Sequence, residues 1–240
     1  MKPGRDHQLI AAVAVAALLA TLPSSGQQEP GANREAARQR MVRQDIAARG
    51  VSNPAVLQAM GRVPRHLFVP PGVSDFAYED RPLPIGLGQT ISQPYIVAYM
   101  TEALRLAPNQ TVLEIGTGSG YQAAVLAELV REVLTIEIVP ELAERAHRTL
   151  AQAGYKNVQV RTGNGYLGWP ERAPFQRIIV TAAPETIPQA LVDQLAVGGI
   201  MVVPVGRDAQ QMTIVTKTTT GVTNTQTIRV RFVPMVEPPR

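Results

Sequence analysis

The strongest chemical signal in the sequence is a glycine-rich segment, EIGTGSGY at residues 114–121, between an expected strand and an expected helix. Glycines at such a turn let backbone N–H groups approach a ligand closely. Their spacing is GxGxG, whereas the dinucleotide-binding fingerprint requires GxGxxG. The segment therefore favours a site for one nucleoside with an amino-acid tail, with a plain strand-to-helix turn as the alternative. Its candidate cofactor-binding residues are Glu114, Gly116, Thr117, Gly118, Ser119 and Gly120.

Two further candidates follow the next two expected strands. Glu137 ends one strand about twenty residues after the glycines, where a carboxylate can accept hydrogen bonds from both ribose hydroxyls. Asn164 and Gly165 follow the other strand, at the sheet edge where ligands of parallel sheets bind, and Asn164 is placed to meet an adenine edge. The alternatives are an exposed glutamate at a strand end and an ordinary Asn-Gly turn.

Hydroxyl groups mark a fourth segment, GQTISQPY at residues 88–95. Thr90 and Ser92 have no obvious capping role, although an N-cap for the helix near Pro94 is the alternative. Residues 72–94 are expected to form a long ordered loop, and a loop of that length in a compact domain is usually functional or mobile.

Alternating strands and helices are expected to position these residues. The apolar spacing predicts helices over residues 34–49, 54–60, 96–106, 121–129, 140–153 and 187–195. It predicts strands over residues 111–115, 133–137, 158–162, 178–180 and 199–205, and a terminal antiparallel pair over 212–217 and 227–232. This order predicts an α/β fold with a doubly wound, mostly parallel sheet that helices cover on both faces.

Composition limits the function further. The 240 residues carry a net charge of +4 and are 45% hydrophobic, which suits one globular domain. The arginines are scattered and form no dense basic run, which argues against binding of nucleic acid. The chain has no cysteine, and its three histidines have no paired-ligand spacing, so we expect neither a disulfide nor a metal site.

The first residues are typical of a signal peptide. Lys2 and Arg5 precede an apolar run over residues 9–22, and small residues follow up to Gly26. The run is too short to span a bilayer comfortably, and a mis-chosen start or an unstructured leader is the alternative. We therefore expect a leader over residues 1–26, a linker over 27–33 and a single domain over 34–240. Within that domain, residues 34–95 carry N-terminal helices and the active-site loop, 96–206 the cofactor-binding core, and 207–240 the C-terminal strands.

Several segments together resemble the protein-L-isoaspartate O-methyltransferase family over roughly residues 34–236. They are VPRHLFV (63–69), LPIGLGQTISQPYIVA (83–98), VLEIGTGSGYQ (112–122), PFQRIIVTAA (174–183), LAVGGIMVVPVG (195–206) and RFVP (231–234). The resemblance implies a Rossmann-like, seven-stranded methyltransferase sheet. It also implies S-adenosylmethionine as methyl donor, S-adenosylhomocysteine as its product, no metal, and isoaspartyl peptides and proteins as substrates. The methyl ester would collapse spontaneously to a succinimide, which hydrolyses partly to normal aspartate, so the repair would need no second active site.

The resemblance also assigns roles to residues. Ser92 corresponds to the family's active-site serine, and Gly116, Gly118, Glu137, Asn164 and Gly165 fall on cofactor-binding positions. Substrate contacts are expected from Thr90, Ile91, Ser92, Val233 and Pro234. The family usually has Asp where this chain has Asn164, whose carbonyl oxygen can still accept a hydrogen bond.

The chemistry so implied needs no strong base, because a carboxylate acceptor is already ionised at neutral pH. We therefore expect Ser92 to orient the acceptor and not to act as a nucleophile.

Three other functions remain open: an NAD-dependent dehydrogenase, a methyltransferase that acts on a small molecule or another protein site, and a non-catalytic binding module. We expect a monomer without stable membrane association once the leader is removed. The family is cytoplasmic by default, whereas the leader favours export to the periplasm.

Overall fold

The central element is one mixed sheet. A computed structural model describes Met1 and residues 30–237, so the expected leader lies outside the described residues apart from Met1. Within residues 30–237, seven strands pair in the order β5-β4-β3-β6-β7-β8-β9. Their bounds are β3 (Thr111–Ile115), β4 (Glu132–Glu137), β5 (Val158–Thr162), β6 (Phe175–Val180), β7 (Leu195–Val205), β8 (Gln210–Thr218) and β9 (Gly221–Val230). Strands β3 to β7 pair in parallel, and β8 and β9 extend the sheet antiparallel, which confirms the predicted fold class.

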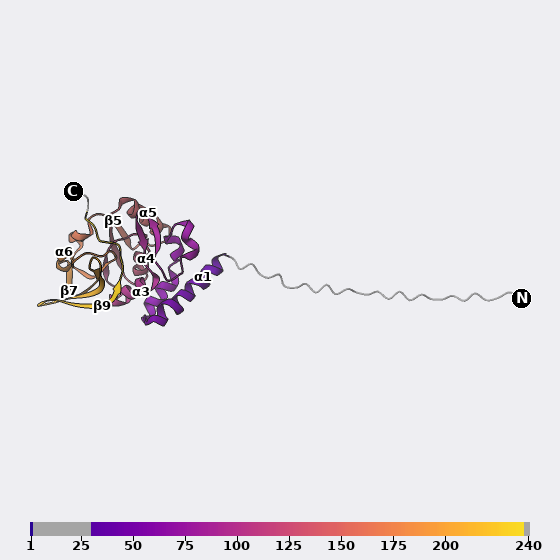
Figure 1. Cartoon of the computed structure of the whole chain (residues 1–240), viewed down its shortest axis with the longest axis horizontal. Coiled ribbons are helices and arrows are strands. Elements are labelled where there is room, and N and C mark those ends of the chain that lie inside the picture. Colours follow the sequence, from indigo (N-terminus) through magenta and orange to yellow (C-terminus); the bar gives the residue numbers. More distant parts are fainter. Residues whose placement is uncertain (2–29, 238–240) are drawn as a thin grey trace.

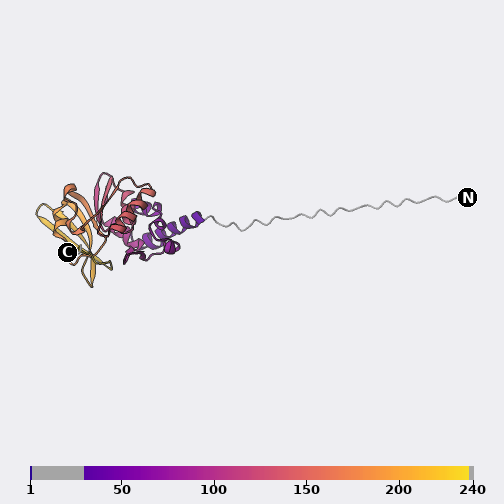
Figure 2. The same ribbon diagram turned by 90° about the horizontal axis from the view of Figure 1, so that it is seen from above.

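Helices cover both faces of this sheet, and Figures 1 and 2 show the N-terminal helices at one end of the domain and the β8–β9 pair at the other. The α-helices are α1 (Pro30–Arg40), α2 (Pro54–Arg62), α3 (Pro94–Ala103), α4 (Tyr121–Ala127), α5 (Pro140–Gln152) and α6 (Gln189–Asp193). The π-helical and 3-10 turns are η1 (Met41–Ile46), η2 (Ala47–Arg49), η3 (Arg65–Phe68), η4 (Pro71–Phe76), η5 (Gly165–Leu167) and η6 (Pro170–Arg172).

Successive residues of the central strands bury their side chains on opposite faces. Val112 and Ile179 belong to a cluster that includes apolar side chains of α2, α3, α4 and α5. Their chain neighbours Leu113 and Ile178 belong to a second cluster, which includes side chains of α6. Because neighbouring side chains in a strand point to opposite faces, a continuous apolar run is what a strand needs when both faces are covered.

Helix starts follow local chemistry. Pro54, Pro94 and Pro140 each occupy the first turn of a helix, where the missing N–H is harmless and the fixed φ suits the helix. The Asn53 side chain also caps α2, since it accepts hydrogen bonds from the N–H groups of Ala55 and Val56 at 3.0 and 3.2 Å.

The N-terminal helix corrects one expected boundary. Helix α1 begins at Pro30, whereas the linker was expected to continue to Asn33. A proline at the first helical position explains the earlier start, because it is compatible with helical backbone from that residue onward. The helix continues through η1 and η2 to Gly50, whose φ of +99° ends it in the left-handed region.

The segment expected to be a loop at residues 72–94 contains regular structure. Its two strands, β1 (Leu83–Gly86) and β2 (Gln89–Ile91), form an antiparallel hairpin outside the main sheet. The turn needs positive φ at Gly86, Leu87 and Gly88, and glycine adopts this conformation without strain. The prolines at 82 and 84 obscured the hairpin, because proline is depleted in strands.

None of the helices within residues 30–237 is long and apolar enough to cross a membrane.

Candidate functional site

A pocket lies at the carboxyl ends of β3, β4 and β6. It has an empty volume of about 870 Å³ that includes space open to solvent, within the range usual for small-molecule sites. The hairpin β1–β2 and the C-terminal segment after β9 form its other walls. Its lining residues include Thr90, Ile91, Ser92, Gly116, Thr117, Gly118, Ser119, Glu137, Gly165, Thr181, Val233 and Pro234. The fold thus brings together candidate residues from widely separated parts of the chain.

The glycine segment turns sharply between β3 and α4. The N–H of Gly116 donates to the carbonyl of Ile136 at 2.8 Å, so the turn is tied to the neighbouring strand β4. Gly116 has a φ of +98°, and a Cβ there would lie 2.5 Å from the Thr181 hydroxyl oxygen. Only glycine therefore fits at this position, for both conformational and steric reasons.

Glu137 ends β4 and faces the pocket with only 5% of its surface exposed. Its Oε2 accepts a hydrogen bond from the Gly118 N–H at 2.7 Å, and its Oε1 accepts one from the Val139 N–H at 3.0 Å. Each carboxylate oxygen has two lone-pair sites, so both can accept a further hydrogen bond. The carboxylate is thereby fixed in orientation and keeps the capacity to bind a pair of hydroxyl groups.

Gly165 lines the pocket and its neighbour Asn164 does not. A Cβ at Gly165 would collide with the Ile115 side chain. The backbone here lies so close to β3 that only glycine fits at this position. The Asn164 side-chain oxygen caps η5 by accepting from the Tyr166 N–H at 2.9 Å. That oxygen therefore has a local structural role in addition to the adenine contact expected of it.

Glu114 and Gly120 lie outside the pocket lining. Gly120 packs against helix α5, where a Cβ would lie 3.2 Å from Leu150. Glu114 is fully buried, and neither of its carboxylate oxygens has a hydrogen-bond partner among the described residues. Burial raises the pKa of Glu114 to about 8; repulsion from Glu137 adds to the rise and the nearby Thr135 hydroxyl offsets part of it.

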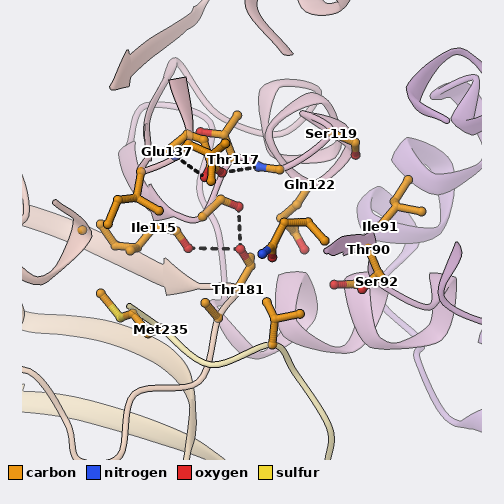
Figure 3. A pocket seen from close by; sticks show the side chains of 18 of the residues that line it. Thr90, Ile91, Ser92, Ile115, Thr117, Ser119, Gln122, Glu137, Thr181 and Met235 are labelled. Atoms are coloured by element: carbon orange, nitrogen blue, oxygen red, sulfur yellow. Dashed lines mark hydrogen bonds between the residues drawn. The ribbon is translucent and has the colours of Figure 1, made fainter. Parts of the chain in front are cut away.

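Ser92 follows the hairpin directly and faces the pocket. Figure 3 shows Thr90 and Ser92 across the pocket from Glu137, with Thr181 between the two sides. The Ser92 hydroxyl makes no hydrogen bond within residues 30–237. It is thus available to donate to a ligand.

Asp80 holds the segment after Ser92 in place. Its carboxylate accepts from the Gln93 side-chain amide at 2.7 Å and from the Tyr95 N–H at 2.9 Å, and it pairs with Arg49 at 2.6 Å. These contacts fix the entry into α3 and so the position of Ser92. This role of Asp80 could not be predicted from the sequence, because no local pattern links an aspartate to residues more than ten positions later.

The C-terminal segment reaches the pocket through pairing with a distant loop. The Ala183 N–H donates to the Val233 carbonyl, and the Met235 N–H donates to the Ala183 carbonyl, each at 2.8 Å. Val233 and Pro234 consequently line the pocket. Tyr166 adds a hydrogen bond from its hydroxyl to the Met235 carbonyl at 3.1 Å.

Thr181 also lines the pocket, although no role was predicted for it from the sequence. Its hydroxyl is within hydrogen-bonding distance of the carbonyls of Ile115 and Gly116, at 3.0 and 2.6 Å, and joins β6 to the glycine turn. Its position directly after the apolar run of β6, at the carboxyl edge of the sheet, was the available signal.

Comparisons with known proteins agree with this geometry. Residues 36–239 match the family model "Protein-L-isoaspartate(D-aspartate) O-methyltransferase (PCMT)". A protein-L-isoaspartate O-methyltransferase of Gloeobacter violaceus is 62% identical over 197 residues, covering 81% of this chain and 96% of that protein. One from Synechococcus sp. is 56% identical over 227 residues, covering 90% of this chain and 93% of that protein.

Two solved structures share the fold. A protein-L-isoaspartate O-methyltransferase superimposes with a TM-score of 0.75 at 29% identity, and the match covers 82% of this chain and 65% of that one. A Plasmodium falciparum protein in complex with S-adenosyl-L-homocysteine superimposes with a TM-score of 0.73 at 23% identity, covering 84% of this chain and 99% of that one.

Proposed function

Because this chain belongs to the protein-L-isoaspartate(D-aspartate) O-methyltransferase family, we propose that its pocket joins a nucleoside site at Glu137 to an acceptor site at Ser92. The enzyme transfers a methyl group from S-adenosylmethionine to the free α-carboxylate of L-isoaspartyl residues in damaged proteins. The backbone amide nitrogen that follows the residue then attacks the methyl ester, methanol leaves, and the resulting succinimide hydrolyses partly to normal aspartate. These roles are assigned because the Ser92 hydroxyl makes no hydrogen bond within residues 30–237 and lies across the pocket from Glu137 (Figure 3).

The residues present fit S-adenosylmethionine. The Glu137 carboxylate is oriented by two backbone N–H groups and can accept the two ribose hydroxyls. The backbone at Gly116 packs against Thr181 and that at Gly165 against Ile115, and both glycines line the pocket without a side chain that would enter it. When bound, the cofactor supplies an electrophilic methyl group on a positively charged sulfur.

The protein's own part in the reaction is positioning. The acceptor carboxylate is already ionised, so no side chain has to remove a proton from it. Ser92 donates a hydrogen bond to one of its oxygens and turns the acceptor toward the methyl group. Thr90, Ile91 and Val233 form walls that exclude water from the acceptor, which leaves the anion less solvated and more reactive.

The substitution Ser92→Ala tests the role of the serine. A hydrogen bond to a charged group contributes about 1.5–3 kcal/mol, so we expect kcat/KM for an isoaspartyl peptide to fall about 10- to 100-fold. Calorimetric titration should show an unchanged affinity for S-adenosylhomocysteine, because Ser92 is assigned to the acceptor. A large loss of cofactor affinity with unchanged turnover at saturation would contradict this role.

The acceptor itself is tested with paired peptides. We expect methylation of a peptide that contains isoaspartate and none of the same peptide with normal aspartate. Equal methylation of both peptides, or methylation of a small molecule alone, would instead support a methyltransferase with another acceptor.

We further infer an exported, monomeric enzyme with a leader over residues 1–26 and a single catalytic domain. The charged start and apolar run of the sequence support export. N-terminal sequencing of the mature protein should find a start near Gln27, and a start at Met1 would argue against cleavage. Sedimentation of the purified protein should give the mass of one chain, and a titration with duplex DNA should show no binding at physiological salt.

A further inference from the structure

A second groove continues from the methyl-transfer pocket along the end of β9. Thr90, Ser92, Thr181 and Val233 line both cavities, so the groove opens where the acceptor carboxylate is assigned. A peptide whose isoaspartyl group enters the pocket must extend through space next to Ser92. The groove is therefore the available path for the residues that flank the damaged position.

The groove is basic. Arg49, Arg229 and Arg231 line it, and no aspartate or glutamate does. Arg49 is already engaged, because it pairs with Asp80 at 2.6 Å and its guanidinium lies 3.5 Å from the centre of the Tyr95 ring. Its charge is thus largely compensated within the protein.

Arg229 and Arg231 differ from Arg49 in this respect. Both are exposed, and neither makes an ion pair or a side-chain hydrogen bond within residues 30–237. Two uncompensated cations two residues apart produce a positive potential in the groove. Neither guanidinium has a visible structural role to explain its position.

The backbone that carries these arginines is held firmly. Arg229 pairs with Gln211 in the β8–β9 ladder. At Phe232 the N–H donates to the Gln210 side-chain oxygen at 2.6 Å, and the carbonyl accepts from the Gln210 amide at 3.0 Å. Arg231 lies between these two fixed points. A ligand would therefore meet two cations whose backbone positions need no rearrangement, which lowers the entropic cost of binding.

We propose that Arg229 and Arg231 form a specificity subsite that binds an acidic side chain, aspartate or glutamate, next to the isoaspartyl residue of the substrate. The inference rests on the proposed function, because it places the acceptor at Ser92. It goes further by naming the class of peptide that the enzyme prefers. A guanidinium is well suited to this task, since its fork of N–H donors matches a carboxylate.

Matched isoaspartyl peptides test the subsite. Each peptide carries glutamate or glutamine at one position before or after the isoaspartate, and the readout is the ratio of kcat/KM for the glutamate and glutamine versions. Exposed charge pairs are individually weak, so we expect a ratio of about 3 to 10 at the best position for the unaltered enzyme at low ionic strength. The preference should appear in KM and should decline as salt is added.

Variants then assign the preference to the two arginines. The double substitution Arg229→Gln and Arg231→Gln should reduce the ratio to about 1. The control is Arg148→Gln, which removes one positive charge from the exposed face of α5, away from the groove, and should keep the preference. A ratio near 1 for the unaltered enzyme at every position, or a ratio that persists in the double variant, would overturn the proposal.

The test separates this inference from the proposed function. An enzyme that methylates no isoaspartyl peptide refutes the function itself, whereas methylation without a charge preference refutes only the subsite. Equal losses with both peptides in the double variant would also refute it, because the arginines would then serve the common acceptor. Unchanged affinity for S-adenosylhomocysteine in the double variant shows that the cofactor site remains intact.

Discussion

Replacing Glu114 by glutamine should change how the stability of this protein depends on pH. The carboxyl group is fully buried in β3 without a hydrogen-bond partner among the described residues, and its pKa is raised from 4.5 to about 8. The folded protein therefore holds this proton more tightly than the unfolded chain does. The associated stability is fully present below about pH 4.5 and is lost as the pH rises through about 8.

The size of the effect follows from the pKa rise. One pKa unit corresponds to about 1.4 kcal/mol, so the rise to about 8 corresponds to about 5 kcal/mol over the whole range. Between about pH 5.5 and pH 8.5 the free energy of unfolding should lose about 3 kcal/mol from this group. Glutamine has nearly the same shape and does not titrate, so Glu114→Gln should lack this loss.

Urea unfolding at a series of pH values measures the difference. The free energy of unfolding of the unaltered protein minus that of Glu114→Gln should fall steadily over this range. Any constant cost of burying the amide cancels in the pH dependence. Glu144→Gln, an exposed substitution on α5, should retain the pH dependence of the unaltered protein. The reasoning is refuted if the curves of the unaltered protein and of the Glu114→Gln variant run parallel within about 0.5 kcal/mol.

Three further substitutions test the local structure. Gly165→Ala should weaken S-adenosylhomocysteine binding at least about 10-fold by calorimetry, because the added methyl collides with Ile115; unchanged affinity would contradict the close approach. Thr181→Val should cost about 1–2 kcal/mol in urea unfolding through loss of its hydrogen bond to β3 or Gly116, whereas Thr181→Ser should cost clearly less. Asn53→Ala should cost about 1 kcal/mol by removing the cap of α2, and Asn53→Asp should restore most of it; equal stability of all three would argue against capping.

Much of the core could be predicted from local patterns. Strands β3 and β5 have the bounds predicted from the sequence; β3 is the buried strand that its short apolar run indicates, whereas β5 is partly exposed. The glycine turn and Glu137 likewise depend on spacing along the chain. A nucleoside pocket at the carboxyl edge of the sheet follows from these features alone.

Other parts of the site depend on contacts between distant residues. Val233 reaches the pocket because its carbonyl accepts from Ala183, about fifty residues earlier in the chain. The hairpin β1–β2 forms although Pro82 and Pro84 weaken the local strand signal, because its apolar side chains Leu83 and Ile91 are buried in the core. The periodicity of apolar residues along the sequence does not predict such pairings between distant segments.

The type and order of the sequence elements determined the sheet, the glycine turn and the class of cofactor, because each depends on periodicity or spacing over a few residues. Only the tertiary structure decided that Glu114 is fully buried outside the lining of the pocket, where its pKa rises. It also decided that Arg229 and Arg231 line the same groove as Ser92. The physical reason is that burial, charge compensation and the walls of a cavity are set by which distant segments pack together.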